Sequence, residues 1–158
     1  FGTTGGVIEA AIRTASEWLT GKELEKIEFE ELRGLKCIRG AQVKIGDLNL
    51  KVGIAHGLGN ARKLLDGIRS KKYDFDAIEI MACPGGCIGG GGQPYHHGHE
   101  EILLKRQRAL YDIDKNKKFR KAHENPMIKE IYENYLGKTY GERAHDLLHT
   151  SYSPREKI

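Results

Sequence analysis

The sequence predicts an α/β fold, in which a small mixed or parallel sheet is flanked by helices and followed by a helical tail. Two observations predict it. Segments with the two-residue period of strands alternate with segments of helical period up to residue 83. After residue 100 only helical patterns remain. We therefore expect two parts, residues 1–100 as an α/β lobe and residues 101–158 as a helical tail packed on it.

The first expected element is a helix that opens after a glycine turn and stops at Gly21. Its apolar residues share one side at helical spacing, which predicts a buried stripe: Val7, Ile8, Ala11, Ile12, Ala15 and Leu19. The next segment, EKIEFEELRGL, alternates as a strand does.

A hairpin is expected from VKIGDLNLKVGIAHG, because the turn dipeptide Gly46-Asp47 separates two alternating arms. GLGNARKLLDGIRS then predicts a short helix, and YDFDAIEIMAC predicts another strand. Ligands of open α/β sheets bind at the carboxyl edge, where this last strand ends.

The tail predicts three helices. The first is EILLKRQRALYDID; the second, NPMIKEIYENYLG, has Asn125 as N-cap, Pro126 at its first position and Gly137 beyond its end. ERAHDLLHT is the third. An apolar stripe on the second helix is expected to be buried: Ile128, Ile131, Tyr132, Tyr135 and Leu136.

Composition excludes several classes of protein. The chain is 39% hydrophobic and 30% charged, as expected for a protein with a core, and no apolar run approaches the roughly 18–20 residues of a membrane span. Its net charge of +4 arises after residue 100, where a solvated helix face is favoured over nucleic-acid binding. Three cysteines without an even-numbered disulfide framework indicate a reducing compartment, the cytoplasm.

The stretch EIMACPGGCIGGGGQPYHHG, residues 79–98, holds the strongest candidate site. Cys83 and Cys87 are four residues apart, so a helical turn would place both thiols about 6 Å apart on one face. Thiolates are soft ligands that suit iron–sulfur clusters. Six glycines are expected to clear one side of the thiols for close approach of a bulky or anionic ligand: Gly85, Gly86, Gly89, Gly90, Gly91 and Gly92.

Other readings of these residues stay open. The two cysteines could be an unreactive buried pair or a redox disulfide. The histidines His96, His97 and His99 are expected to form a solvated loop rather than a metal site. HGLGNARK fits an anion loop or a tight helix entry equally well. Packing positions are expected for three further residues: Cys37, Trp18 and Tyr95.

The residues from Glu79 to Pro94 fit E-x-M-x-C-x-x-G-C-x-x-G-G-G-Q-P, and this pattern resembles the third cysteine signature of the [FeFe]-hydrogenase catalytic domain. FGTTGGVIEAAIRT resembles the family's FG-x-TGGVMEAALRT segment. HGLGNARKLL with CIGGGGQPYHHG is similar to the NADH-linked, electron-bifurcating members. KAHENPMIKEIYENYLG and ERAHDLLHT resemble the C-terminal tail, which in some members is a separate small subunit.

The resemblance implies an H-cluster, a [4Fe–4S] cubane joined to a two-iron unit that carries CO, cyanide and a dithiolate amine. It implies that Cys83 binds the cubane alone and that Cys87 bridges the cubane and the two-iron unit. It also implies that Met81 packs against the two-iron unit, and that Phe1 and Gly2 line the same cavity. The implied reaction is reversible H2 oxidation and proton reduction.

Two family signatures, T-S-C-C-P and M-P-C-x-x-K, are absent from the chain, and with them the other two cubane ligands. We therefore expect the C-terminal portion of a hydrogenase catalytic subunit, active only with its upstream half. The implied partners are that half, ferredoxin, and NADH-linked or formate dehydrogenase subunits. Further iron–sulfur clusters are expected in the parent enzyme or in its partners.

Two other functions remain in competition with this one. A non-catalytic iron–sulfur or assembly module related to hydrogenases could hold a half-ligated cluster or dock on a hydrogenase. A zinc-binding or redox-active protein could use the same two cysteines.

Overall fold

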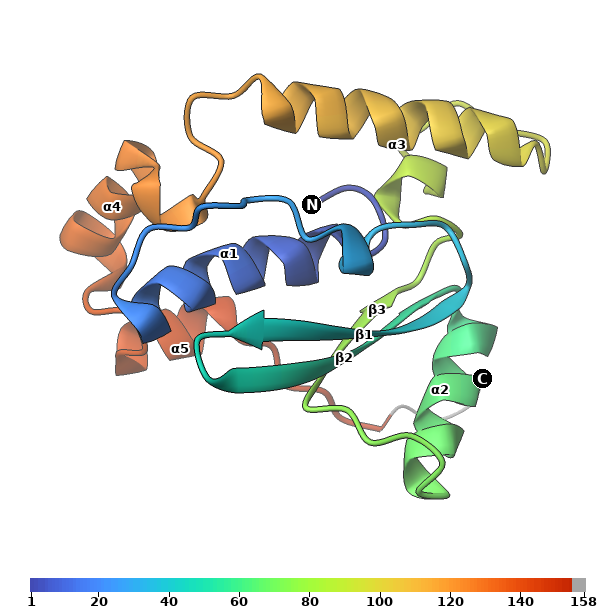
Figure 1. Ribbon diagram of the computed structural model, residues 1–158, viewed down its shortest axis with the longest axis horizontal. Coiled ribbons are helices and arrows are strands. Elements are labelled where there is room, and N and C mark those ends of the chain that lie inside the picture. The colour runs from blue at the N-terminus through green and yellow to red at the C-terminus, as the bar shows by residue number, and fades with distance from the viewer. Residues whose placement is uncertain (155–158) are drawn as a thin grey trace. The chain divides into compact units, whose positions relative to one another are not determined.

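The computed structural model describes residues 1–154 and confirms the α/β class (Figure 1). One sheet contains β1 (Ile38–Ile45), β2 (Leu48–His56) and β3 (Ala77–Met81), in the order β1-β2-β3. β1 runs antiparallel to β2, and β3 runs parallel to β2. The sheet is therefore mixed, and β2 and β3 end at the same edge.

The hairpin and the crossover follow the sequence pattern. β1 turns into β2 at Gly46-Asp47, and Gly46 has a φ of +58°, a left-handed conformation that glycine adopts without a Cβ penalty. Helix α2 (Leu58–Arg69) connects β2 to β3 and packs against β2. This crossover pairs His56 with Met81 at the ends of the two parallel strands.

Helix α1 (Gly6–Thr20) ends as predicted, because Gly21 adopts the left-handed conformation and its N–H bonds the Glu17 carbonyl. The predicted apolar stripe is confirmed only in part: Ile12 is buried and Ile8 packs against the core, whereas Val7 and Leu19 are exposed. Glu9 and Arg13 share the inner face with Ile12 because they pair there with each other, so apolar spacing alone does not define that face. The buried residues of the helix are Gly6, Glu9, Ile12, Arg13 and Ser16.

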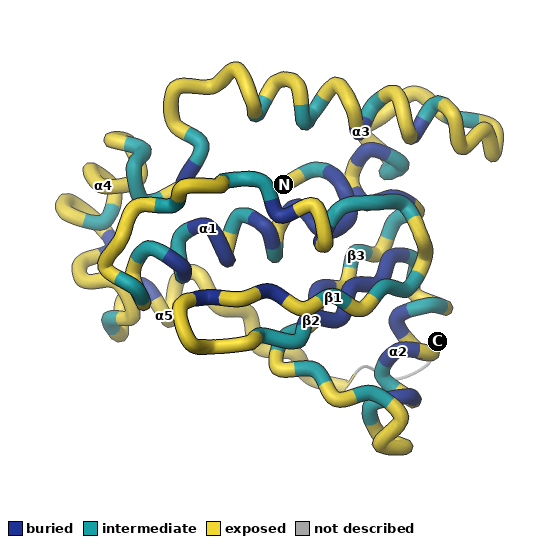
Figure 2. The backbone as a smooth tube through the Cα atoms, viewed as in Figure 1, coloured by how far each residue is buried: buried dark blue, intermediate teal, exposed yellow. Residues whose placement is uncertain are grey.

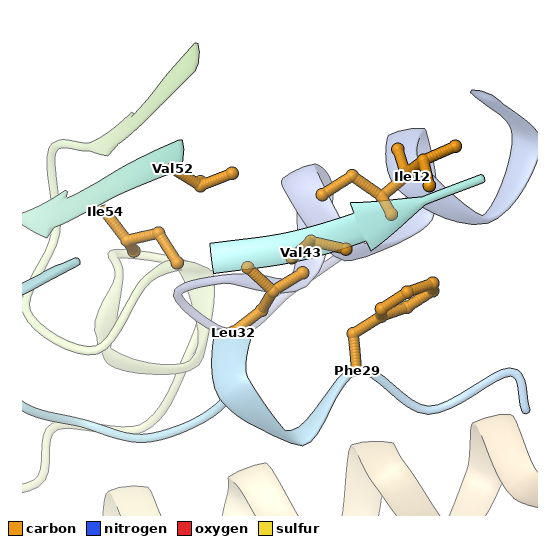
Figure 3. Close-up of a cluster of buried hydrophobic side chains, with 7 residues drawn as sticks. Ile12, Phe29, Leu32, Val43, Val52 and Ile54 are labelled. Atoms are coloured by element: carbon orange, nitrogen blue, oxygen red, sulfur yellow. The ribbon is translucent and has the colours of Figure 1, made fainter. Parts of the chain in front are cut away.

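The hydrophobic core joins α1 to one face of the hairpin (Figure 3). Ile12 packs with residues of both strands and with Phe29 and Leu32. The strand predicted over EKIEFEELRGL is wrong, since Glu30–Leu32 forms a short 3₁₀ turn. Phe29 and Leu32 are three residues apart, and a strand would send them to opposite faces, whereas a turn places both in the core.

Buried charges connect α1 to helix α3 (Glu100–Lys115). The Arg13 guanidinium donates to both carboxylate oxygens of Asp114, at 2.9 and 3.0 Å, and to Glu9 at 2.9 Å. Arg33 also donates to Glu9, at 2.7 Å. Arg120 donates to Asp114 at 2.7 Å. Each charge of this network thus has a partner of opposite sign, which stabilises its ionised form away from water.

This network makes the stability of the protein depend on pH. Burial alone would raise the pKa of Asp114, but hydrogen bonds from Arg13 and Arg120 outweigh it and lower the pKa. A carboxylate with a lowered pKa stabilises the fold above its unfolded-state pKa, and that stability is lost as the pH falls through the folded-state value. We expect the free energy of unfolding to decrease as the pH falls below about 4. Urea denaturation at several pH values checks this, and an equal slope in Asp114→Asn would contradict it.

After α3 the tail continues with a 3₁₀ turn, η3 (Ala122–Glu124), then α4 (Pro126–Ile131), a π-helical turn η4 (Tyr132–Leu136) and α5 (Glu142–Leu148). Asn125 caps α4 as predicted, since its side chain accepts from the Met127 N–H at 3.0 Å. Of the apolar stripe, Leu136 is buried and Tyr132 is half-buried, whereas Ile128, Ile131 and Tyr135 are 39%, 46% and 52% exposed. Burial of the whole stripe stays a prediction.

The chain divides into two compact units, residues 1–120 and the segment from Lys121 onward. Helix α3 lies in the first unit, and a boundary near residue 100 stays a prediction. Buried positions are frequent in α1 and the sheet and sparse along α3 and the tail helices (Figure 2). None of the helices within residues 1–154 is long and apolar enough to cross a membrane.

Candidate functional site

The candidate site begins at the edge of the sheet where β2 and β3 end. The Gly57 N–H donates to the Met81 carbonyl at 2.8 Å and joins the two strand ends. Cys83 lies two residues beyond Met81 and opens a loop that we call the cysteine loop, residues 83–94. The sequence predicted this position, because the carboxyl ends of parallel strands are where α/β sheets present their binding loops.

His56 holds the cysteine loop through a side-chain hydrogen bond. Its ring is buried, and Nδ1 accepts the Gly85 N–H at 3.0 Å. The other ring nitrogen, Nε2, lies 2.9 Å from the Leu35 carbonyl. Because Nδ1 accepts a hydrogen bond, the proton belongs on Nε2, which donates to Leu35. Sequence reasoning missed this role, although His56 at the end of a strand was a visible signal.

The N-terminal residues pair with the cysteine loop as a short antiparallel segment. The Thr4 N–H donates to the Gly85 carbonyl at 2.9 Å, and the Ile88 N–H donates to the Gly2 carbonyl at 3.1 Å. This pairing holds Gly2 directly against the loop. The Phe1 ring next to it is 75% exposed.

Glu79 fixes the start of α1 beside the loop. Its buried carboxylate accepts the N–H of Gly5 at 2.6 Å and the N–H of Ile8 at 2.9 Å. These are donors of a helix N-terminus, where a negative charge is favoured and no side chain of the helix itself provides a cap. Glu79 of the signature therefore ties α1 and the N-terminal residues to β3.

Four predicted site residues meet around one turn of the loop. Cys83 and Cys87 are free thiols, the first half-buried and the second exposed. A Cβ placed on Gly90 would lie 3.3 Å from both the Cys83 Sγ and the Cys87 carbonyl oxygen. A Cβ placed on Gly86 would lie 2.6 Å from the Met81 Sδ and 3.0 Å from the Gly2 carbonyl oxygen. The loop thus gathers Gly2, Met81 and both cysteines.

The six glycines do not all serve one purpose. Gly85 and Gly86 have φ values of +75° and +94°, and a Cβ on Gly89 would lie 2.1 Å from the Pro84 carbonyl oxygen. The expectation that all six clear space for a ligand is wrong for these three, because they close the turn itself. Only Gly91 and Gly92 of the set have open space around the Cβ position.

Gly86→Ala tests this assignment. The new methyl group would collide with the Thr4 nitrogen at 2.8 Å, and the left-handed φ adds strain. We expect the free energy of unfolding to fall by at least about 2 kcal/mol, measured by urea denaturation. Gly91→Ala is the matched control in the same loop, with an expected change below about 0.5 kcal/mol. Equal effects of the two substitutions would contradict the assignment.

The remaining candidates lie at the surface. Cys37 is exposed rather than a packed apolar residue, which corrects the prediction. Tyr95 is 75% exposed, so it is not a core residue, and Trp18 is about half exposed, at 49%. The Tyr95 ring makes an edge contact with His97, with ring centroids 4.6 Å apart.

The predicted solvated histidine loop is confirmed in part. His97 and His99 are exposed, and His99 lies 3.1 Å from a Glu101 carboxylate oxygen, whereas His96 is half-buried. HGLGNARK forms a tight entry to α2, where the Asn60 side chain donates to the His56 carbonyl at 2.9 Å.

The ligand chemistry of the site is that of two thiols. Within residues 1–154, no three side chains of His, Cys, Asp or Glu come together as a metal site. Cys83 and Cys87 are two soft sulfur donors on a turn closed by glycine, and such donors fit part of the ligand set of an iron–sulfur cluster.

Comparison with family models covers most of the chain. Residues 1–91 match the model described as iron only hydrogenase large subunit, C-terminal domain. Residues 100–155 match the model described as iron hydrogenase small subunit.

Individual relatives agree with these models. The NADP-reducing hydrogenase subunit HndD of Solidesulfovibrio fructosivorans is 58% identical over 100% of this chain and 27% of its own length. Iron hydrogenase 1 of Clostridium pasteurianum is 42% identical over 96% of this chain and 27% of its own length. Cytosolic iron-sulfur assembly component 3 of Rattus norvegicus is 31% identical over 99% of this chain and 33% of its own length. The chain thus spans about a quarter to a third of these relatives.

A solved structure shares the fold. A variant of [FeFe]-hydrogenase HydA1 from Chlamydomonas reinhardtii superimposes with a TM-score of 0.74 at 40% sequence identity. The match covers 96% of this chain and 45% of that chain. With the family model matched over residues 1–91, the sequence resemblance is confirmed. The chain belongs to the family of the iron-only hydrogenase large subunit, C-terminal domain.

Proposed function

We propose that the chain is part of an iron hydrogenase that catalyses reversible H2 oxidation and proton reduction at an H-cluster. The observation that carries the proposal is the cysteine loop: two free thiols on one glycine-closed turn at the carboxyl edge of the sheet. The 58% identity to an NADP-reducing hydrogenase subunit over the whole chain supports it.

The proposed roles follow the positions of the residues. Cys83 would bind the cubane, and Cys87 would join the cubane to the two-iron unit. Met81, Phe1 and Gly2 would line the cavity of that unit. The H-cluster, when bound, would supply the redox and heterolytic chemistry of H2. Residues of this chain orient the thiols, because His56 and the N-terminal residues fix the loop from two sides through hydrogen bonds to Gly85.

The proposed partners supply what the described residues do not. The upstream half of the catalytic domain would provide the other two cubane cysteines. Further iron–sulfur clusters, and ferredoxin, NADH-linked or formate dehydrogenase subunits, would exchange electrons with the site. The relative named as a subunit of an NADP-reducing hydrogenase supports a multisubunit assembly. We propose a cytoplasmic location, since the three cysteines of the chain are free.

A second candidate is a non-catalytic role in iron–sulfur assembly. It is favoured by the match to cytosolic iron-sulfur assembly component 3, although that identity is 31%. H2 oxidation with an artificial electron acceptor separates the two functions, measured on the full protein after maturation. A hydrogenase reduces the acceptor in H2 only. An assembly module binds iron and leaves the acceptor unreduced, and this outcome would overturn the proposed function.

A further inference from the structure

One face of α3 contacts both segments that build the site. Leu103, Arg106, Gln107 and Leu110 have the spacing i, i+3, i+4 and i+7, which places them on one side of a helix. Leu103 is buried. A Cβ placed on Gly85 would lie 3.4 Å from one of its methyl carbons, and a Cβ placed on Gly89 would lie 3.3 Å from the other. This face therefore supports the turn that carries the cysteines.

The same face also holds the N-terminal residues. The Gln107 side chain donates to the Thr3 hydroxyl at 2.8 Å, and both residues are buried. A Leu110 methyl carbon lies 3.0 Å from the Cβ position of Gly2. The first helix of the segment matched by the small-subunit model thus packs on the site itself.

Arg106 bonds two carbonyls of the cysteine loop. Its guanidinium donates to the Ile88 carbonyl at 2.7 Å and to the Pro94 carbonyl at 2.6 Å. These carbonyls lie on either side of the Gly89–Gly92 run. Local backbone hydrogen bonds order part of this run: the Gly89 N–H donates to the Gly86 carbonyl at 3.0 Å and the Gly90 N–H to the Cys87 carbonyl at 3.1 Å. Glycine loses more conformational freedom on ordering than any other residue, so the run still depends on contacts that hold its two ends. A planar guanidinium with several donors can bond both ends of the run at once.

We propose that Arg106 is a positioning residue for the cysteine loop. By binding the carbonyls of Ile88 and Pro94 it closes the glycine run, and it thereby fixes Cys87, the residue before Ile88, for cluster binding. The inference rests on the proposed function, since it concerns retention of the cluster in the hydrogenase. From the sequence we expect residues after 100 to form a tail packed on the lobe, but no sequence pattern identifies Arg106.

The test compares three variants of the holoenzyme: Arg106→Ala, Arg106→Lys and Arg108→Ala. Arg108 lies on the exposed side of the same helix and is the matched control. We expect Arg106→Ala to lose iron to a chelator about 10- to 100-fold faster than the parent enzyme, the usual effect of removing a group that orients a metal ligand. Arg106→Lys keeps the charge but loses the planar fork, so we expect it to resemble Arg106→Ala. Arg108→Ala should retain iron as the parent does.

Two readouts separate local positioning from general destabilisation. The infrared bands of CO and cyanide should shift or broaden in the Arg106 variants and stay unchanged in Arg108→Ala. Amide hydrogen exchange should rise in residues 88–94 and stay constant in β2. Equal iron loss, bands and exchange in the Arg106 and Arg108 variants would overturn the inference.

The proposed function fails in a different way. A parent enzyme that shows no CO or cyanide bands after maturation would overturn the hydrogenase assignment for every variant alike. Hydrogen exchange of residues 88–94 in Arg106→Ala would still report whether the Arg106 hydrogen bonds to Ile88 and Pro94 order the cysteine loop. Rescue by Arg106→Lys to the parent rate of iron loss would show that charge alone acts, and would contradict the bidentate role.

Discussion

Cys87→Ser is expected to lower the rate of H2 oxidation by at least about a hundredfold and to remove the CO and cyanide infrared bands of the holoenzyme. The serine hydroxyl is a harder ligand that rarely ionises, so it binds iron of an iron–sulfur cluster much more weakly than a thiolate does. Cys83→Ser is expected to lower the iron content and the activity for the same reason. Activity in H2 and iron per protein are the measurements.

Cys37→Ser is the matched control for these substitutions. Cys37 is also a free, exposed thiol, but it lies outside the cysteine loop. We expect its replacement to leave activity, iron content and infrared bands at the parent values. Full activity in Cys87→Ser would contradict the roles proposed for the loop, and equal losses in all three variants would point to general thiol damage instead.

Arg13→Met is expected to decrease the free energy of unfolding by about 3–5 kcal/mol, the usual cost of removing one partner from a buried ion pair. Arg13 is 6% exposed, and besides Asp114 and Glu9 its guanidinium donates to the carbonyls of Ile27 and Arg120, both at 3.0 Å. Methionine fills a similar volume but has no N–H group, so the two carboxylates and the two carbonyls lose the hydrogen bonds that Arg13 donates. Urea denaturation at neutral pH measures the change.

Arg69→Met is the control for that substitution. Arg69 pairs with Asp66 at 3.2 Å on the surface of α2, where both side chains are largely exposed. Surface ion pairs contribute little, so we expect a change below about 0.5 kcal/mol. Similar losses at the two positions would contradict a special role for the buried network.

The parts of the fold predicted from sequence are those set by local pattern. Gly46-Asp47 marks the hairpin turn, and Asn125 with Pro126 marks the start of a helix, because a turn or cap depends on a few adjacent residues. The position of the cysteine loop after β3 was predicted because the strand pattern runs directly into it and α/β sheets present binding loops at the carboxyl ends of strands. The signature pattern from Glu79 to Pro94 identified the family before any contact was known.

The parts that failed depend on contacts between distant residues. Glu9 and Arg13 are charged, yet they line the inner face of α1, because Arg33 and Asp114 pair with them from 24 and 101 residues away. Arg106 bonds Ile88 across 18 residues, and no local pattern indicates it. The spacing of apolar residues cannot predict such pairs. A buried charge is stable only with a partner, and that partner lies far away in the sequence.

The central claim is that this chain supplies two thiolates of an H-cluster. The most direct test is the infrared spectrum of the matured full protein together with its iron count. We expect CO and cyanide bands and more iron than one cubane holds. We also expect those bands to be lost in Cys87→Ser. Bound iron without CO or cyanide bands, or bands that persist in Cys87→Ser, would contradict it.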